Sequence, residues 1–342
     1  MKIADLIKWS QKEYAHLPWR QNRTLYRTLV SEIMLQQTTV GTVKNHYDRF
    51  LKTFPDLKSL ALASEEELLV AWKGLGYYRR ARSLKKIAEA LFTDHKGEFP
   101  HDLEKLQEIS GIGPYTASAL VGIGMDKRAL AVDANIERVI ARLFGLKTEK
   151  GLKLQKEIQK MFVSGEIFAD KKISFRALNE AFMDLGRTLC QARKASCELC
   201  QLKNDCEAFK SGKPLLYPKA KDEVAKKVVE HEVHLLRVFV MKKNKLLVYK
   251  KNNDEWLSGQ YEVPTFILKS SDPKLKQYPK VLKKFKTVKE YKTGITKYSI
   301  VNSIALASEK DLEGFERELI WREIGDDHSN FSTATLKGLA VL

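Results

Sequence analysis

All four cysteines of the chain fall in one short segment, at Cys190, Cys197, Cys200 and Cys206. Any fold of this chain must place these four thiols in one loop. Four unrelated free cysteines would instead be scattered along the sequence. The segment therefore predicts a site with four thiolate ligands. Either a tetrahedral zinc ion or an iron–sulfur cubane suits such a donor set. Zinc sites usually use two close C-x2-C pairs, and this segment has one.

Length and charge limit the class of protein. At 342 residues the chain predicts two cores, and its formal charge of +17 favours a polyanionic partner, nucleic acid being the commonest soluble one. A merely soluble basic protein is the alternative. No apolar run approaches the ~18 residues that span a bilayer. The start, Met1 to Tyr14, is amphipathic and unlike a secretory signal, which predicts an intracellular protein of the cytoplasm or nucleoid, in a reducing compartment.

The first half of the chain has helical periodicity almost throughout. Ser64, followed by three glutamates, is typical of a helix N-cap with acids in the first turn. No convincing alternating strand is present, so residues 1–209 predict an all-α domain. Apolar residues recur at three- and four-residue spacing in Leu25–Leu35, Val40–Phe54, Glu65–Trp72 and Ala81–Phe92.

The pattern changes after residue 209. Residues 210–228 combine glycine, prolines and a run of charges, which predicts a linker. Residues 229–342 then predict a smaller α+β domain, with a turn at Lys242–Lys245. The expected strands are Val233–Val240, Leu246–Tyr249, Tyr261–Leu268 and Tyr298–Ala307, and the expected short helices are Leu312–Ile320 and Thr333–Leu339.

A glycine-rich turn joins two expected helices, Leu103–Ile109 and Ala117–Gly122. Gly111 and Gly113 allow a tight turn, and the exposed amides that follow could bind a DNA phosphate. Alone, this pattern more often marks an ordinary helix–helix turn. About twenty residues later Asp133 lies near the start of another helix, where it could also be a plain N-cap.

The order of these motifs is more specific than any one of them. A helix–hairpin–helix, then V-D-x-N-x-x-R-V, then four cysteines resembles the endonuclease III superfamily of base-excision glycosylases across roughly the first 210 residues. Within it, the chain is similar to adenine DNA glycosylases of the MutY type. The segments that carry this likeness are 17–20 (LPWR), 31–38 (SEIMLQQT), 72–82 (WKGLGYYRRAR) and 179–186 (NEAFMDLG).

The resemblance implies a function and a cofactor. It implies a helix-hairpin-helix glycosylase domain with an iron–sulfur loop at 190–206, a [4Fe–4S] cluster on the four cysteines, and a Nudix-like lesion-recognition domain after it. The substrate would be double-stranded DNA with adenine opposite 8-oxoguanine or guanine, bound by a monomer with no membrane partner. Tyr115 stands where bifunctional relatives have a lysine, so the resemblance implies hydrolysis without lyase chemistry.

Two carboxyls with different tasks are needed to cleave the bond between adenine and its sugar. Glu32 lies in an otherwise uncharged run, an environment that raises a carboxyl pKa. By resemblance, Glu32 protonates adenine N7 and later activates water, while Asp133 stays ionised near C1′. Tyr115 would hydrogen-bond into that site, and Asn135 would orient groups around it.

The resemblance also implies contacts with the flipped nucleotide. The positions that match the adenine pocket are Trp19, Arg20, Leu35, Thr38 and Glu180, although aromatics at helical spacing, such as Trp19, are more often core. The positions that match insertion near the lesion are Gln37 and Tyr77, and their neighbour Gln36 contacts either DNA or the core.

The second domain departs from the family at its lesion-reading loop. Thr296 keeps a hydroxyl there, but Lys297 replaces the family's histidine and Ile295 its aromatic residue. These substitutions predict weaker discrimination of the opposite base, and the alternative is that they are ordinary strand residues. The basic stretch 283–292 would face DNA or only solvent. The metal-binding box of Nudix hydrolases is absent from the sequence, so no nucleotide hydrolysis is expected.

Two other functions remain open at this point. One is a relative that acts on another mispair, such as thymine opposite guanine. The other is a lesion-binding protein without catalysis, against which the presence of both Glu32 and Asp133 argues.

Overall fold

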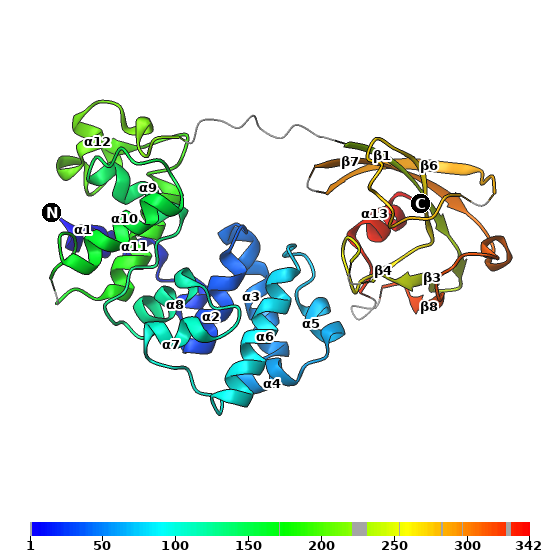
Figure 1. Cartoon of the computed structure of the whole chain (residues 1–342), viewed down its shortest axis with the longest axis horizontal. Helices are drawn as coiled ribbons and strands as arrows, with labels where there is room; N and C mark the ends of the chain where they lie inside the picture. The colour runs from blue at the N-terminus through cyan, green and yellow to red at the C-terminus, as the bar shows by residue number, and fades with distance from the viewer. Residues whose placement is uncertain are drawn as a thin grey trace. The chain divides into compact units, whose positions relative to one another are not determined.

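The computed structural model describes residues 2–170, 172–220, 231–252, 254–281, 283–295, 297–325 and 330–342. The chain divides into two compact units. A helical unit comprises residues 1–63 and 74–223, and a sheet unit comprises residues 64–73 and 224–342. The predicted linker at 210–228 falls partly outside the described residues. Figure 1 shows the elements of both units, which are described separately below.

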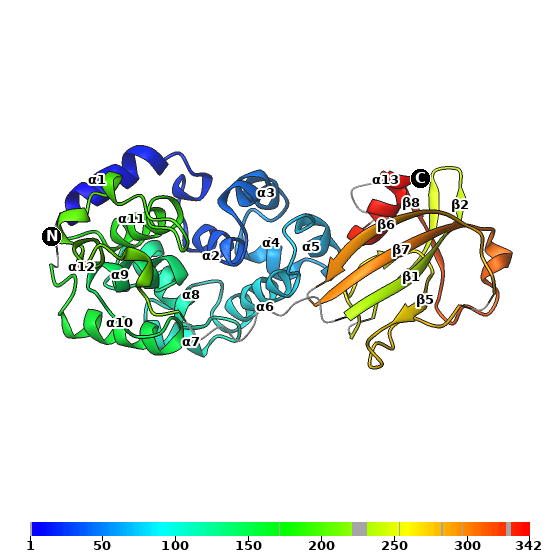
Figure 2. The same cartoon turned by 90° about the horizontal axis from the view of Figure 1, so that it is seen from above.

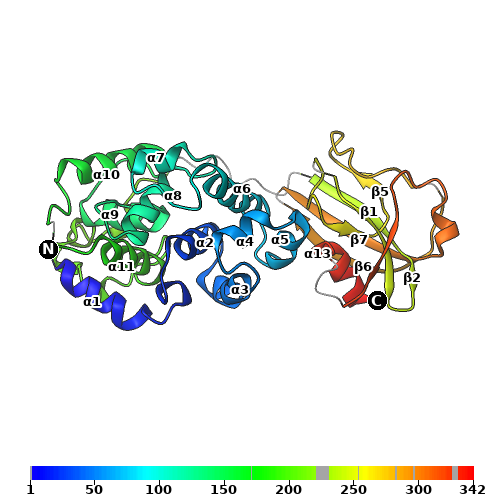
Figure 3. The same cartoon turned by 90° about the horizontal axis from the view of Figure 1, so that it is seen from below.

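The helical unit is built from short amphipathic helices, as the periodicity predicts. Figure 3 shows α11 between α1 and α9, and its buried face forms much of one core. The helices are α1 (Ile3–Tyr14), α2 (Leu25–Leu35), α3 (Val40–Thr53), α4 (Leu57–Leu62), α6 (Arg79–Asp94), α7 (Leu103–Glu108), α8 (Pro114–Ala119), α9 (Ala134–Leu143), α10 (Leu152–Ser164), α11 (Phe175–Thr188) and α12 (Glu207–Lys210).

Local signals set several helix boundaries. Ser64 caps α5 (Glu65–Ala71), a helix of the sheet unit, by a capping box with Glu67, which confirms the predicted N-cap. The predicted helix Leu25–Leu35 is confirmed residue for residue. The second helix of the hairpin begins at Pro114, and its α-helical part ends at Ala119, where a π-helical turn over Leu120–Gly124 follows.

The described part of the sheet unit contains two small sheets and the helices α5 and α13. Strands β5, β1, β7 and β6 lie side by side in that order, with β1 parallel to β7 and the outer pairs antiparallel (Figure 2). In the second sheet β3 pairs with β2, β4 and β8. The bounds are β1 (His231–Phe239), β2 (Met241–Lys242), β3 (Lys245–Lys250), β4 (Tyr261–Glu262), β5 (Thr265–Ser270), β6 (Thr287–Ile295), β7 (Tyr298–Leu306), β8 (Ile320–Glu323) and α13 (Thr333–Val341).

Two expectations for this unit are wrong. The predicted strand Tyr261–Leu268 is two strands in different sheets, because Pro264 between them has no N–H for the ladder. The predicted helix Leu312–Ile320 is not formed: a 3₁₀ turn over Glu309–Leu312 ends at its first residue, Gly314 follows with a φ of +88°, and Ile320 begins β8. The basic stretch 283–292 contains most of β6, an edge strand with mostly exposed side chains. Its lysines masked the alternation that predicts a strand.

A buried ionic cluster lies inside the sheet unit. Glu262 is 1% exposed, and its carboxylate accepts hydrogen bonds from Arg237 and Lys251, both at 2.6 Å. Tyr249 and Tyr278 also donate to Glu262, at 3.1 and 3.3 Å. Although burial acts to raise the pKa of Glu262, the two cations lower it to about 2. This carboxylate is therefore ionised and fully paired.

Among the described residues, no helix is both long and apolar enough to cross a membrane.

Candidate functional site

Helix α2 carries Glu32 in its buried middle. The helix begins after Thr24, whose side-chain oxygen accepts the Arg27 N–H, and most residues of the following turns are buried. Glu32 itself is 5% exposed. Loss of hydration raises the pKa of Glu32 to about 7, against the opposing effect of a hydrogen bond from Tyr115. Near neutral pH the Glu32 carboxyl can therefore both give and take a proton.

Tyr115 is held by the helical hairpin. Gly111 has a φ of +99°, and a Cβ there would lie 2.9 Å from a side chain of α6, so both conformation and space require glycine. Pro114 opens α8 in the favoured first position. The Tyr115 hydroxyl donates to Glu32 Oε2 at 2.6 Å. Because burial raises the pKa of Tyr115 well above 10, the phenol keeps its proton.

Asp133 is the N-cap of α9, as one of the two sequence interpretations expects. Its Oδ1 accepts the N–H groups of Asn135 and Ile136 at 2.9 and 2.7 Å, and its Oδ2 accepts Asn135 Nδ2 at 2.8 Å. Burial raises the pKa of Asp133, and these hydrogen bonds act in the opposite direction by favouring the carboxylate. The cap thus favours the carboxylate form and fixes the direction of the side chain.

The start of α9 is held against α11. Arg138 Nη2 donates to Asn135 Oδ1 at 2.9 Å and to the Gly186 carbonyl at 2.7 Å. A Cβ on Gly186 would lie 2.5 Å from the Asn135 Cβ, so the two helices meet where no side chain separates them. Arg138 Nε also donates to the Cys190 carbonyl, at 2.8 Å. Arg138 therefore links Asn135, and the Asp133 cap beside it, to α11 and to the segment that follows α11.

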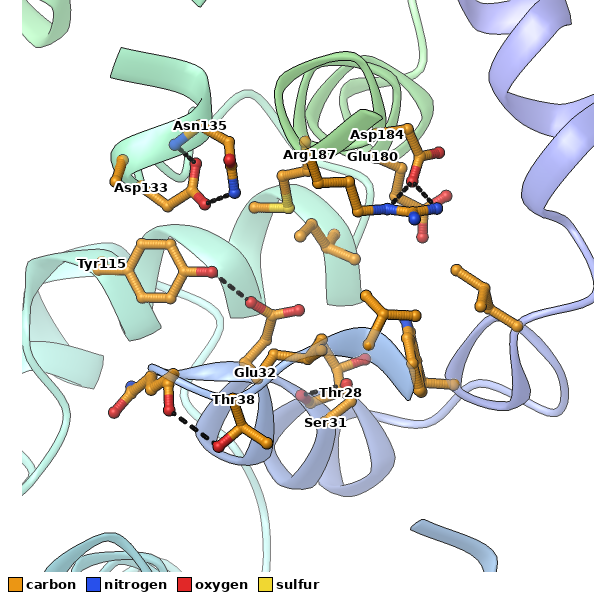
Figure 4. Close-up of a pocket in the computed structure, with 18 of the residues that line it drawn as sticks. Thr28, Ser31, Glu32, Thr38, Tyr115, Asp133, Asn135, Glu180, Asp184 and Arg187 are labelled. Atoms are coloured by element: carbon orange, nitrogen blue, oxygen red, sulfur yellow. Dashed lines mark hydrogen bonds and ion pairs between the residues drawn. The ribbon is translucent and has the colours of Figure 1, made fainter. Parts of the chain in front are cut away.

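A cavity of about 970 Å³ brings these side chains together (Figure 4). Its wall includes all four residues predicted to be catalytic, namely Glu32, Tyr115, Asp133 and Asn135. Figure 4 shows the Tyr115 hydroxyl directed at Glu32, with Asp133 and Asn135 on the same side of the cavity as Tyr115. This volume suits a small molecule or a single nucleotide. An acid of raised pKa and a hydrogen-bonded carboxylate thus line one space.

Another part of the wall is ionic. Arg20 Nη1 and Arg187 Nε donate to different oxygens of Asp184, at 2.9 and 3.0 Å, and Asp184 is 1% exposed. Glu180 pairs with Arg23 and lies 3.5 Å from Arg20 Nε. That Nε is buried and lacks a hydrogen-bond acceptor in the described structure. The charged side chains of this part of the wall therefore pair mainly with one another.

Sequence reasoning missed Arg23, Asp184 and Arg187 as cavity residues. A signal was present for two of them. Asp184 lies one helical turn after Glu180 in the same quoted segment, and Arg23 follows Arg20 by three residues. Arg187 lies outside every quoted segment, and nothing in the sequence marks it.

Most of the other predicted contacts also line the cavity. Trp19, 7% exposed, packs edge-on against Tyr47 with 5.9 Å between the ring centroids, so it is both a core and a cavity residue. Three predicted positions do not line the cavity: Gly111, Gly113 and Tyr77, the last of which is 54% exposed. The predicted contacts that do line it are Trp19, Arg20, Leu35, Gln36, Gln37, Thr38 and Glu180.

The four cysteines lie in the segment after α11, each partly buried and none in a disulfide. Burial and the neighbouring thiols raise the pKa of Cys200 to about 11, and the same two causes raise the pKa of Cys197 and of Cys206. Arg142 Nη1 donates to Cys190 Sγ at 3.2 Å. Among the described residues, no three metal-binding side chains are arranged to hold a single metal ion. The donor set still fits a four-thiolate group, because a bound cation would relieve the mutual repulsion of the thiolates.

The predicted lesion-reading positions belong to the sheet unit. Lys297 lies in the turn between β6 and β7, with its Nζ 5.6 Å from the centroid of the Tyr298 ring. Thr296 falls outside the described residues.

Comparisons with known proteins show to which family the chain belongs. Residues 30–163 match the family described as HhH-GPD superfamily base excision DNA repair protein. The adenine DNA glycosylase of Buchnera aphidicola subsp. Schizaphis graminum is 30% identical over 248 residues, which cover 72% of this chain and 67% of the relative. That of Buchnera aphidicola subsp. Acyrthosiphon pisum is 33% identical over 214 residues, covering 62% of this chain and 60% of the relative.

A solved structure gives the same fold. A thermostable thymine-DNA glycosylase superposes with a TM-score of 0.54 and 27% identity, over 61% of this chain and 95% of that chain. The likeness therefore covers most of that protein but leaves more than a third of this chain unmatched.

Proposed function

The chain belongs to the adenine DNA glycosylase family of the helix-hairpin-helix superfamily, and on that premise we propose that it hydrolyses the N-glycosidic bond of adenine mispaired with 8-oxoguanine or guanine in double-stranded DNA. The observation that carries the proposal is that Glu32 and Asp133 line one cavity in unlike environments. Hydrolysis of this bond needs a neutral acid for the leaving base and an anion for the sugar, so an unlike pair is the arrangement required.

Glu32 supplies the proton. With a pKa raised to about 7, it retains enough of the acid form near neutrality to protonate adenine N7, which makes the base a better leaving group. Once it has lost that proton, the Glu32 carboxylate can accept one from the attacking water. The Tyr115 hydroxyl, 2.6 Å away, holds the carboxyl in place during both steps.

Asp133 stabilises the sugar. As the adenine leaves, positive charge develops at C1′, and a fixed carboxylate nearby lowers the energy of that state without having to reorient. The N–H groups at the start of α9 and the Asn135 amide keep Asp133 anionic and immobile. Tyr115 has no amine, so no Schiff base forms and strand cleavage does not follow excision.

The remaining predicted contacts bind the flipped nucleotide and the duplex. Glu180 and Arg20, from the ionic wall, provide an acceptor and a donor for the polar edge of adenine, between Trp19 and Leu35. Thr38 completes this pocket. Gln36, Gln37 and Tyr77 enter the duplex near the lesion, and the hairpin with Gly111 and Gly113 binds a phosphate.

We further propose that Cys190, Cys197, Cys200 and Cys206 hold a [4Fe–4S] cluster. Such a cluster would cross-link the loop that carries the four cysteines, and a saturated four-thiolate site leaves no position for substrate. Residues 1–209 then form the catalytic domain, 210–228 the linker, and 229–342 a Nudix-like domain that reads the opposite base. In that domain Thr296 and Lys297 contact the lesion, with discrimination weaker than a serine–histidine pair would give.

The test uses purified full-length protein and three duplexes, with A opposite 8-oxoguanine, A opposite guanine and T opposite guanine. We expect adenine release from the first two, with strand breaks appearing only after alkali. Release of thymine without adenine would overturn the substrate, and strand breaks without alkali would overturn hydrolysis as the sole chemistry.

Asp133→Asn separates catalysis from binding in the same assay. Because asparagine also caps helices well, α9 should stay intact, and excision should fall by at least about 10³-fold while duplex binding is retained. For the cluster, broad visible absorption with four iron atoms per chain is expected from the cubane. Stoichiometric zinc in a colourless preparation would contradict it.

A further inference from the structure

Two segments that the proposed function assigns to DNA meet at one buried side chain. Residues 36–38 follow α2 and include Gln37, and residues 74–77 precede α6 and include Tyr77. Arg80, in the first turn of α6, contacts both segments and is 6% exposed. It does not line the cavity, so it has no part in the mechanism above.

The Arg80 guanidinium donates to both segments and to the end of α2. Nη1 donates hydrogen bonds to carbonyls at the end of α2 and just after it, and Nη2 donates mainly to the segment before α6. The acceptors are Ile33 O (2.9 Å), Met34 O (2.7 Å), Gln36 O (2.5 Å), Thr38 Oγ1 (2.8 Å), Leu75 O (3.1 Å) and Gly76 O (3.3 Å). Carbonyls at a helix end otherwise lack partners, so one cation satisfies a group of buried acceptors.

The two segments share an unfavourable backbone conformation. Gln37 has a φ of +56° and Tyr77 a φ of +46°, in the left-handed region that side chains disfavour. In each case the preceding carbonyl, of Gln36 or of Gly76, accepts a hydrogen bond from Arg80. The orientation of that peptide plane fixes φ of the next residue. Such strained conformations persist only where the surroundings hold them, and they gather at functional sites.

We propose that Arg80 is the positioning residue that sets Gln37 and Tyr77 together for entry into DNA, an inference that rests on the proposed function. The guanidinium centre also lies 5.5 Å from the centroid of the Tyr77 ring, which further ties the exposed aromatic side chain to the same group. Because Arg80 is hydrogen-bonded to both segments, a structural change in one segment is transmitted to the other. Lysine cannot replace it, because a point ammonium with three donors cannot span acceptors on two sides.

The first test needs no catalysis. Hydrogen exchange followed by mass spectrometry is measured on Arg80→Lys and on the matched control Arg128→Lys. Arg128 also donates to backbone carbonyls, of Phe162 and Phe168, and does not line the cavity. We expect exchange in both 36–38 and 74–77 to speed up by about ten-fold or more in Arg80→Lys, and neither segment to change in the control.

A second variant keeps the inference testable if Arg80→Lys does not fold. Thr38→Val removes one Arg80 acceptor and keeps the side-chain shape. If Arg80 couples the segments, exchange at 74–77 should also rise in this variant. A rise confined to the neighbourhood of residue 38, or unchanged exchange in Arg80→Lys, would overturn the inference.

The functional readout is a double-mutant cycle on adenine excision under single-turnover conditions. Arg80→Lys should slow excision by about 10–100-fold with little loss of affinity for undamaged duplex, because misplacement affects the flipped state and leaves phosphate contacts intact. Adding Tyr77→Ala should then cost much less than it does in the native chain. Fully additive losses would overturn a role exerted through Tyr77. If the native chain released no adenine at all, the proposed function would fail, while the exchange results would still decide whether Arg80 couples the segments.

Discussion

Glu32 in the helical unit and Glu262 in the sheet unit are both almost fully buried, yet their protonation is opposite. Glu32 has its pKa raised to about 7, whereas Arg237 and Lys251 hold that of Glu262 at about 2. Burial is a large effect at both positions, so the difference comes from the partners. Glu32 accepts a hydrogen bond from a neutral phenol, and Glu262 accepts from two cations. A buried carboxyl without a cation is available for proton transfer, and one with two cations contributes to structure.

The largest expected effect is on catalysis. Glu32→Gln should lower the single-turnover excision rate by about 10³-fold, because the amide has no proton to give. Thermal unfolding near neutral pH should occur at the native temperature or above it, since glutamine removes the cost of burying an ionised carboxyl. Glu13→Gln, at an exposed position of α1, is the matched control and should change neither quantity. Equal loss of stability and activity would make Glu32 a structural residue and break the comparison.

Glu262→Gln should give the reverse result. Removing the carboxylate leaves Arg237 and Lys251 buried without their counter-charge, which costs about 3–5 kcal/mol of the free energy of unfolding. Urea titration followed by circular dichroism would measure this loss. At a temperature where the variant is folded, excision of adenine should remain within a few-fold of the native rate. A neutral effect on unfolding would show that the cluster is dispensable.

The two carboxyls should give stability opposite dependences on pH. Between pH 4.5 and 7 the folded chain keeps a proton on Glu32 that the unfolded chain has released, so the free energy of unfolding falls as pH rises, by about 3 kcal/mol in total. Glu262 is ionised in the folded chain down to pH of about 2, so its contribution is lost as pH falls below 4.5, by a similar amount. Unfolding titrations of Glu32→Gln and Glu262→Gln should each lack one of these slopes. Identical pH profiles in all three proteins would contradict the assignment.

The smallest effect is expected from Tyr115→Phe. The phenol donates to the Glu32 carboxyl and so favours its charged form, which means that its removal should raise the pKa of Glu32 further. Excision should slow by at most about ten-fold, the scale of one hydrogen bond, and its decline at high pH should move to higher pH. A shift to lower pH would mean that the phenol acts on Glu32 in another way.

The sequence predicts the helical unit better than the sheet unit, for a physical reason. Helix signals are local, and the predicted helix Leu25–Leu35 is reproduced residue for residue. Strands depend on partners far away in the chain, so Pro264 divides one apolar run between two sheets without any local sign of where each half pairs.

The site shows the same difference between features that depend on local sequence and features that depend on tertiary packing. An uncharged run around Glu32 predicts a raised pKa, and the structure agrees because helix α2 is buried on nearly every side. Of the ionic wall, Arg20 and Glu180 were predicted, whereas Asp184 and Arg187 were missed because their place in the cavity depends on how helix α11 faces it. Arg80 was likewise only one basic residue among several in its segment, and its acceptors lie up to 47 residues away.

The bare Cα of Gly186 has a further consequence for the carboxylate at the start of α9. Any side chain at that position, even a methyl group, would act as a wedge between two helices at the point where Asn135 supports its neighbour. The absence of a side chain at residue 186 thus sets how closely α9 and α11 approach. Replacement by alanine would therefore affect the position of Asp133, although Gly186 does not line the cavity.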